Sequence, residues 1–174
     1  ERSVIEKLIE IGKPAVPVLI EALHKDLDPS VRRIVLEALG KIGDSRAVPA
    51  LIEALRKDLD RSVRRIVAEA LVKMGDPRAV PALIETLRQD SDPELRLMAA
   101  KALGKFGDPR AVPALIETLR QVKVYELRQM AAETLVKIGR PAVPALIETL
   151  RKDLDPDLRR IVAEALVNIR QPAV

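Results

Sequence analysis

The stretch AVPALIEALRKDLDRSVRRIVAEALVKMG, residues 47–75, is one nearly complete copy of a pattern that fills the chain. Its opening returns as AVPALIETL at 79–87, 111–119 and 142–150, and as AVPVLIEAL at 15–23. Successive copies begin 32, 32, 32 and 31 residues apart. A fixed period of this length indicates a repeat architecture, in which every copy folds into the same small motif.

Each copy is predicted to contain two helices. In the string VRRIVLEALGKIG, residues 31–43, apolar side chains fall at positions i, i+3, i+4, i+7, i+8 and i+11, which is helical spacing. The opening string has the same spacing, and no segment alternates as a strand does. Asp28, Asp92 and Asp155, each followed by proline, are expected to cap the second helices. A left-handed glycine is expected to end them, at Gly12, Gly43, Gly75, Gly107 and Gly139.

Two helices with one apolar stripe each cannot bury that stripe alone, so the copies are expected to stack. We therefore predict an all-α fold, a right-handed α-solenoid of two-helix repeats with a period of 31–32 residues. Gly40 and Gly104 lie inside predicted helices and indicate close helix–helix approach. One domain is expected over residues 1–174, with a partial repeat at 1–14, five repeats at about 15–46, 47–78, 79–110, 111–141 and 142–172, and the start of another at 173–174.

The composition argues against several function classes. The 174 residues include no Cys, so the chain has no thiol nucleophile, disulfide or Cys-ligated zinc. The single histidine, His24, is expected at an exposed helix end, where the helix dipole favours its charge. No catalytic, cofactor or metal site is predicted, so we do not expect an enzyme. Because no apolar run approaches a membrane span and no signal peptide opens the chain, we expect a cytoplasmic protein without membrane contact.

The repeat pattern D-x-D-P-x-V-R-x-x-A-x-x-A-L-x-K-I-G-D-x-R-A-V-P-x-L-I resembles the HEAT-like repeats of the phycobilisome-lyase type, and designed consensus versions of them even more closely. The copies are very alike, since DPRAVPALIETLRQ at 76–89 returns unchanged at 108–121, which favours a designed or recently duplicated array. The resemblance implies a ladder in which an acid before the second helix pairs with an arginine of another repeat. The acids would be Asp26, Asp58, Asp90 and Asp153, and the arginines Arg32, Arg64, Arg96, Arg128 and Arg159.

The fourth repeat departs from this pattern. Residues 122–126 read VKVYE where the other repeats have DLDPS, DLDRS, DSDPE or DLDPD. Val122 and Val124 replace the ladder acid and the helix cap, and the only tyrosine of the chain follows as Tyr125. Two interpretations stay open, namely drift in a tolerant loop, and an exposed apolar patch with a polar rim that binds a partner.

A row of basic side chains recurs on the second helices, at Arg33, Arg65 and Arg160 and at Lys41, Lys73, Lys105 and Lys137. Such a row could follow a phosphate backbone. However, glutamates lie at helical spacing beside it and favour ion pairs within each helix, and the formal net charge is only +4. With almost no aromatic residues available for base stacking, we do not expect nucleic-acid binding.

The middle repeats interrupt the basic row with Leu97 and Gln129, where a protein ligand would meet the least desolvation. We therefore predict a non-enzymatic protein-binding scaffold, either designed or part of a longer array. Polyanion binding and, from the family resemblance, an accessory role in a lyase-type enzyme are the alternatives. Apolar residues in 4–9 suggest uncapped ends and self-association. The predicted contact residues are Arg33, Arg65, Leu97, Lys101, Gln129, Val122, Val124 and Tyr125.

Overall fold

The computed structural model describes residues 2–25 and 28–170, and in this part of the chain it contains α-helices and short 3₁₀ turns but no strand. The predicted Asp26 ladder acid and the repeat start at 173–174 lie outside the described residues. The helices are α1 (Arg2–Ile11), α2 (Val16–Leu23), α3 (Pro29–Ile42), α4 (Val48–Lys57), α5 (Arg61–Met74), α6 (Val80–Gln89), α7 (Pro93–Phe106), α8 (Val112–Gln121), α9 (Tyr125–Ile138), α10 (Val143–Lys152) and α11 (Pro156–Arg170).

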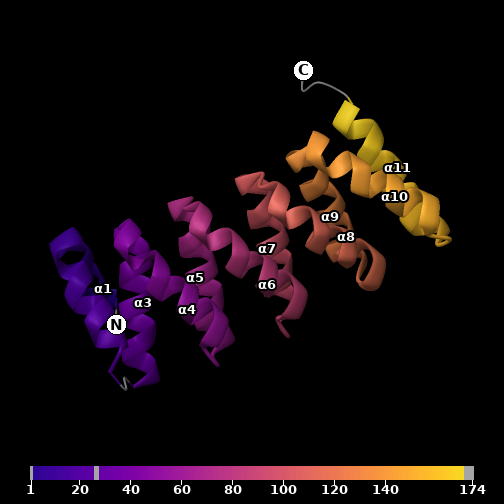
Figure 1. The fold of residues 1–174 in the computed structure, drawn as a ribbon. Helices are drawn as coiled ribbons and strands as arrows, with labels where there is room; N and C mark the ends of the chain where they lie inside the picture. The colour runs from indigo at the N-terminus through magenta and orange to yellow at the C-terminus, as the bar shows by residue number, and fades with distance from the viewer. Residues whose placement is uncertain (1, 26–27, 171–174) are drawn as a thin grey trace. The chain divides into compact units, whose positions relative to one another are not determined.

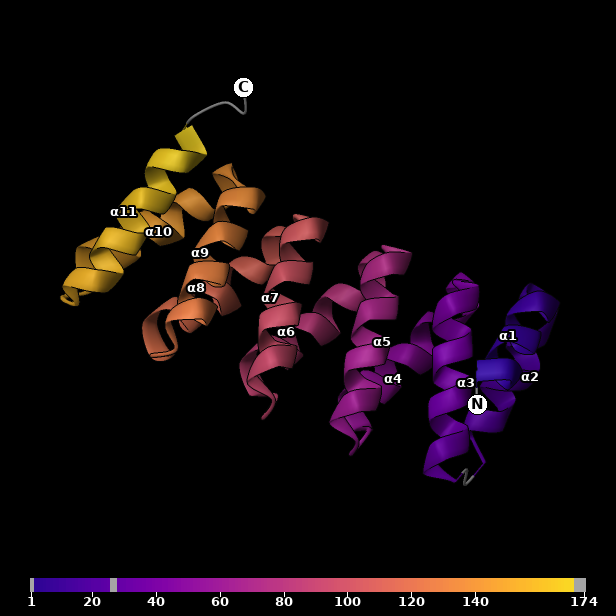
Figure 2. The same cartoon turned by 180° about the vertical axis from the view of Figure 1, so that it is seen from behind.

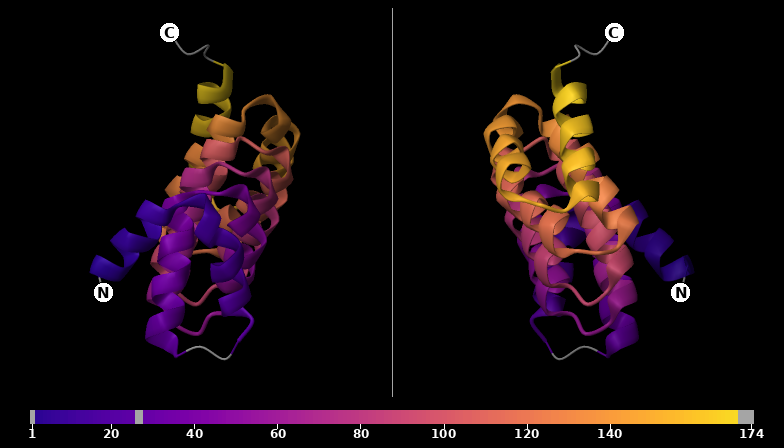
Figure 3. Two further views of the ribbon diagram at one scale, coloured as in Figure 1. Left: turned by 90° about the vertical axis from the view of Figure 1, so that its left-hand side faces the viewer. Right: turned by 90° about the vertical axis from the view of Figure 1, so that its right-hand side faces the viewer.

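The helices form two compact units, divided between Ala82 and Leu83. In unit 1, the second helices α1, α3 and α5 pack side by side in chain order, and α2 and α4 pack against α3 and α5 (Figures 1 and 2). Unit 2 repeats the arrangement, with α7, α9 and α11 adjacent and with α8 and α10 against α9 and α11. Figure 3 shows the same helices from two further directions. This stacking of helix pairs is the α-solenoid architecture that the period predicts.

The core of each unit is aliphatic. Leucines at equivalent positions of successive repeats are fully buried, including Leu39 and Leu71 in unit 1 and Leu103 and Leu135 in unit 2. Small residues let neighbouring second helices approach closely. A Cβ added at Gly40 would lie 2.5 Å from the Cβ of Ala70 on α5, so the predicted close approach is confirmed there. Gly104 on α7 likewise faces the side chains of Thr134 and Lys137 on α9.

The predicted helix caps are confirmed at Asp28, Asp92 and Asp155, whose side chains each accept a hydrogen bond from a backbone N–H in the first turn. At the other end of the second helices, Gly43, Gly75 and Gly107 are left-handed as predicted. The prediction is wrong for Gly12 and Gly139, whose ψ values are -140° and -135°. Their loops are one residue shorter, so the chain turns into the next 3₁₀ segment without a left-handed helical residue.

The longer loops carry a connection that the sequence pattern did not indicate. Asp44 caps the 3₁₀ turn Ser45–Ala47 by accepting from the backbone N–H of Arg46, and it also accepts from the guanidinium of Arg46. The same guanidinium donates to the carbonyl of Lys13 at 3.0 Å. Arg78 donates likewise to the carbonyl of Ser45 at 2.9 Å. In unit 1, each loop is therefore tied to the equivalent loop of the preceding repeat.

Candidate protein-interaction surface

The segment from Val122 to Tyr125 joins α8 to α9 in an extended conformation. Val122 is the C-cap of α8 and Val124 is the N-cap of α9, with φ and ψ values typical of a strand. No side chain caps the first turn of α9, which confirms the predicted loss of the cap. The side chains of Val124 and Tyr125 are 53% and 62% exposed. Two large apolar groups therefore face solvent where the other repeats have an aspartate followed by proline or, in one copy, by arginine.

Tyr125 lies along the first turns of α9, where its hydroxyl accepts a hydrogen bond of 2.9 Å from Nε2 of Gln129. The structure thus brings together two of the predicted contact residues. Leu97 occupies the equivalent register on the adjacent helix α7, half-buried, and Lys101 follows one turn later, exposed. These residues place a mixed apolar and polar surface on the α7–α9 face of unit 2.

The other two predicted contact residues, Arg33 and Arg65, lie in unit 1 on the adjacent helices α3 and α5, and both are half-buried. Nearby, the ammonium of Lys41 pairs with Glu37 at 2.7 Å. This pair shows the expected local neutralisation of the basic row, here at i,i+4 spacing along α3.

The ladder contact is present at the junction between the first and second full repeats. Arg32 of α3 donates from Nε to Oδ2 of Asp58 at 2.8 Å and from Nη2 to Oδ1 at 3.5 Å. The Asp58 side chain is 2% exposed, and its Oδ1 also accepts from the backbone N–H of Asp60 at 2.9 Å. Arg64 donates to the carbonyl of Asp58 at 2.9 Å. A nearly buried carboxylate therefore ties two repeats and the intervening loop together.

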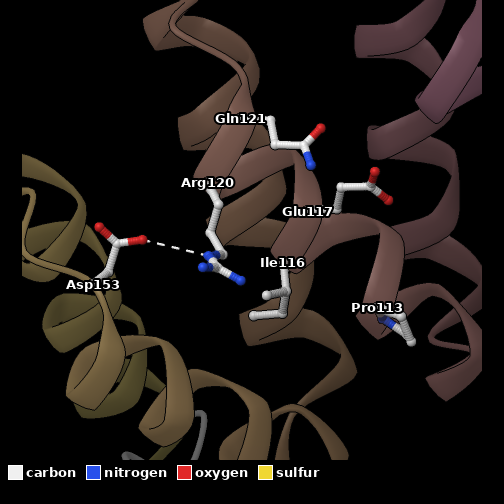
Figure 4. A pocket seen from close by; sticks show the side chains of 6 residues that line it. All are labelled: Pro113, Ile116, Glu117, Arg120, Gln121 and Asp153. Atoms are coloured by element: carbon white, nitrogen blue, oxygen red, sulfur yellow. Dashed lines mark hydrogen bonds and ion pairs between the residues drawn. The ribbon is translucent and has the colours of Figure 1, made fainter.

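Arg128 pairs with an acid that is not among the four implied ladder acids. Its Nη1 lies 3.3 Å from Oδ2 of Asp155, and its Nε donates to the carbonyl of Val122. The predicted acid, Asp153, instead lies 3.4 Å from Nε of Arg120 (Figure 4). The cause is local, because Asp153 ends α10 within reach of α8, which leaves Asp155 at the start of α11 to face Arg128.

Arg96 is the ladder arginine of the third repeat. In the next repeat, the position of the ladder acid is occupied by Val122. Its side chain is half-buried, and its Nε donates to the carbonyl of Leu87 at 2.8 Å. Within residues 2–25 and 28–170, no carboxylate lies within ion-pair distance of Arg96. The junction between the third and fourth repeats therefore retains the ladder cation without its anion.

The helix-capping carboxylates are electrostatically stabilised where they are present. Hydrogen bonds from the side chain and backbone of Ser62 lower the pKa of Asp60 below its ordinary value. Burial acts to raise the pKa of Asp155, but the backbone N–H groups of Leu158 and Asp157, together with Arg128, outweigh it and lower the pKa overall. At neutral pH these caps are anions, so the uncapped start of α9 differs from them in charge as well as in hydrogen bonding.

A groove between α8 and α10 was not indicated by the sequence. Two adjoining hollows of about 390 and 340 Å³ share Pro113, Ile116 and Arg120. Figure 4 shows Arg120 reaching across the first of them toward Asp153. The groove is lined by charges of both signs, because Arg120 and Lys152 lie in it together with Glu148 and Asp153.

The single histidine of the chain lies at the C-terminal end of α2. His24 is exposed after the end of α2, with its Nδ1 2.9 Å from the carbonyl oxygen of Ile20, as expected for a histidine at a helix terminus. Across the described ranges, no group of three or more His, Asp or Glu side chains is arranged to hold a metal ion. Within the same ranges, every helix is too short or too polar to span a bilayer.

The fold and its repeat junctions define an α-solenoid repeat protein. The model for HEAT repeats matches residues 1–71 and 48–125, and the chain belongs to this family. The chain is similar to the complex of CpcE and CpcF of phycocyanin lyase from Nostoc sp. PCC7120, at 31% identity and a TM-score of 0.62, over 88% of this chain and 64% of that one.

A second solved structure is similar in fold. Human deoxyhypusine hydroxylase in complex with glycerol matches at 24% identity and a TM-score of 0.57, over 90% of this chain and 74% of that one. No curated protein matches the sequence significantly. The HEAT-like, phycobilisome-lyase-type resemblance of the repeats is thereby confirmed.

Proposed function

We propose that the chain is a non-enzymatic HEAT-repeat scaffold that binds another protein through the α7–α9 face of unit 2. The observation that carries this proposal is the exposure of Val124 and Tyr125 next to Gln129, with Lys101 exposed on the adjacent helix α7. Exposed aromatic and aliphatic groups with a polar rim are typical of interfaces between proteins. The similar structure is a complex of two proteins, CpcE and CpcF, which supports a protein as the partner of this chain.

The test is affinity capture with the tagged chain, followed by mass spectrometry and by measurement of the dissociation constant for any captured protein. Tyr125→Ala is expected to weaken binding at least tenfold, because it removes the largest exposed apolar group of the surface. Lys73→Ala, which truncates an exposed side chain on α5, is the matched control and should leave binding unchanged. Equal affinity of the wild type and Tyr125→Ala would refute the role of this surface.

A second candidate is an accessory subunit of a lyase-type enzyme, which the 31% identity to a phycocyanin lyase structure favours. The chain spans 64% of that relative, so the role is proposed for the shared repeats alone. Mixing the chain with a complementary subunit, phycocyanin apoprotein and its chromophore would test it. Chromophore attachment measured by absorbance supports the candidate when it requires this chain, and its absence under conditions active for the known lyase contradicts it.

Self-association is a further part of the proposal, since Val4 and Ile11 of α1 are 50% and 57% exposed. Light scattering during size-exclusion chromatography should give a mass above the 19.2 kDa of one chain. A monomer mass at high concentration would contradict it.

The near identity of the copies supports a designed or recently duplicated origin, and the cytoplasm remains the proposed location. Polyanion binding would instead show a steep loss of affinity between low and physiological salt.

A further inference from the structure

The junction between the third and fourth repeats has a cation in place and no anion to match it. At the Arg32–Asp58 junction, the same arginine position is satisfied by two hydrogen bonds to one carboxylate. At the later junction, Val122 takes the place of that acid and Arg96 pairs with no carboxylate of the described chain. The group that this junction lacks is therefore a carboxylate.

Arg96 is held in position although this anion is missing. Its Nε–H donates to the carbonyl of Leu87 at 2.8 Å, so the guanidinium is oriented before any ligand arrives. A guanidinium has five N–H donors in a planar fork, and two of them fit the two oxygens of a carboxylate. An oriented, half-buried arginine loses less side-chain entropy on pairing than a mobile surface arginine does.

The segment that occupies the place of the ladder acid in the fourth repeat is largely apolar. Val122 is half-buried, and Val124 and Tyr125 are mostly exposed. The hydrogen bond from Gln129 restrains the Tyr125 ring along α9. The exposed charges of the segment, Lys123 and Glu126, offset one another. Arg128 also reaches this segment, but its guanidinium already contacts the carbonyl of Val122 and the carboxylate of Asp155, whereas Arg96 pairs with no carboxylate of the described chain.

We propose that Arg96 receives an acidic side chain of a partner protein, whose flanking apolar residues pack on Val122, Val124 and Tyr125. The partner carboxylate pairs with the Arg96 guanidinium beside Val122, as Asp58 pairs with Arg32 at the earlier junction, so the partner supplies the anion that the chain lacks between the third and fourth repeats. This inference rests on the proposed scaffold function and specifies the chemistry of its ligand. The surface made by Arg96, Val122, Val124 and Tyr125 is called the Arg96 surface below.

The experiment uses two short probes, acetyl-Leu-Glu-Leu-amide and its neutral counterpart acetyl-Leu-Gln-Leu-amide, titrated into the ¹⁵N-labelled full chain. The Nε–Hε resonance of Arg96 and the ring resonances of Tyr125 report on binding. We expect the Glu probe to shift both saturably and to bind at least fivefold more tightly than the Gln probe. Equal affinities for the two probes, or shifts that avoid Arg96, would overturn the proposal.

Two variants separate binding from folding. Val122→Asp gives the repeat the ladder acid found in its neighbours, so it should fold at least as well while binding the Glu probe at least fivefold more weakly. Arg96→Gln should weaken the Glu probe to the level of the Gln probe. The matched control is Lys105→Gln, which removes one exposed positive charge from the same helix. A similar loss in Lys105→Gln would show a general charge effect and refute a specific role for Arg96.

The result also separates this inference from the scaffold proposal. If a captured protein partner binds the wild type, Val122→Asp and Arg96→Gln equally, the scaffold stands and the Arg96 surface is refuted. If the chain captures no protein at all, the scaffold proposal fails, whatever the probes do. Tighter binding of a phosphopeptide or an oligonucleotide than of the Glu probe, with steep salt dependence, would refute the carboxylate assignment.

Discussion

Residues 58–60 and residues 122–124 occupy the same place in their repeats and do different things there. Asp58 pairs with Arg32 of the preceding repeat, and Asp60 caps α5 through the backbone N–H of Ser62. Val122 and Val124 do neither, and the second of them is 53% exposed. The comparison distinguishes the apolar packing that forms each repeat from the ion pairs that link one repeat to the next.

The helix itself does not depend on these acids. Both α5 and α9 contain 14 residues, although only α5 has a side-chain cap. In α9, Leu127, Ala131 and Leu135 are buried at helical spacing as their equivalents are in α5. Packing of the apolar face therefore determines the helix, as is usual in folded proteins. The acids contribute stability and junction geometry, and the fourth repeat retains its fold without them.

Removing the intact link should have the largest effect. Asp58→Val is expected to lower the free energy of unfolding by about 2 kcal/mol, since it leaves a half-buried guanidinium without its nearly buried partner. Denaturant unfolding followed by far-UV circular dichroism measures the change. Arg61→Gln, which removes an exposed cation from the first turn of α5, is the control. A loss of less than about 0.5 kcal/mol would contradict the importance of the link.

Restoring the missing acid should have the opposite effect. Val122→Asp is expected to raise the free energy of unfolding by about 1.5 kcal/mol through pairing with Arg96. The gain should disappear when Arg96→Gln is combined with it, as a double-mutant cycle measures directly. Val122→Asn provides a control of similar size without the charge. A gain that survives in the Arg96→Gln background would show another cause.

Restoring the cap should give a somewhat smaller gain. Val124→Asp is expected to stabilise the chain by about 1 kcal/mol, because the new side chain can accept from the backbone N–H of Glu126, as Asp92 does from Glu94. Val124→Ala, which trims the side chain without adding an acceptor, is the comparison. An unchanged unfolding midpoint in Val124→Asp would mean that the first turn of α9 is satisfied in another way.

That gain should also depend on pH. The pKa of the equivalent cap, Asp60, is lower in the folded protein than its ordinary value near 3.8. A carboxylate of this kind stabilises the fold above its unfolded pKa, and the stabilisation is lost as the pH falls through the folded pKa. The difference between Val124→Asp and the wild type should therefore vanish in acid. A difference that stays constant down to pH 2 would exclude a charged cap.

The smallest effect is expected at Tyr125. Tyr125→Phe removes the hydroxyl that pairs with Gln129 and leaves the exposed ring in place. The free energy of unfolding should change by less than about 0.5 kcal/mol, as for most surface substitutions. The same denaturant experiment measures it. A larger loss would assign Tyr125 a structural role and would make the two compared segments more alike than their contacts indicate.

Most of the fold could be predicted from the sequence because the period repeats every local signal. The same signals recur in register, namely the apolar spacing, the capping aspartates and the glycines at helix ends. Gly40, inside a predicted helix, indicated a close approach of two helices because it has no side chain. The exceptional character of residues 122–126 was also predictable, since the other copies show what is missing there.

The partners across junctions could not be predicted in the same way. The next repeat offers Arg128 two nearby acids in sequence, Asp153 and Asp155. Because α10 packs against α8, Asp153 pairs with Arg120, and Arg128 pairs with Asp155. The backbone of Gly12 and Gly139 depends on how a shorter loop closes. The α8–α10 groove likewise arises from the spacing of two helices, which a one-dimensional pattern does not contain.

In our proposal, Val122 leaves the Arg96 guanidinium open to a partner carboxylate and makes the fold less stable than an acid at position 122 would. The most direct measurement is the denaturation midpoint of the wild type and of Val122→Asp, each with and without acetyl-Leu-Glu-Leu-amide at about ten times its dissociation constant. For the wild type, the probe should add about 1.4 kcal/mol of stability by linkage. Val122→Asp should be more stable alone and gain far less from the probe. Equal gains in the two proteins, or no added stability in Val122→Asp, would contradict the account.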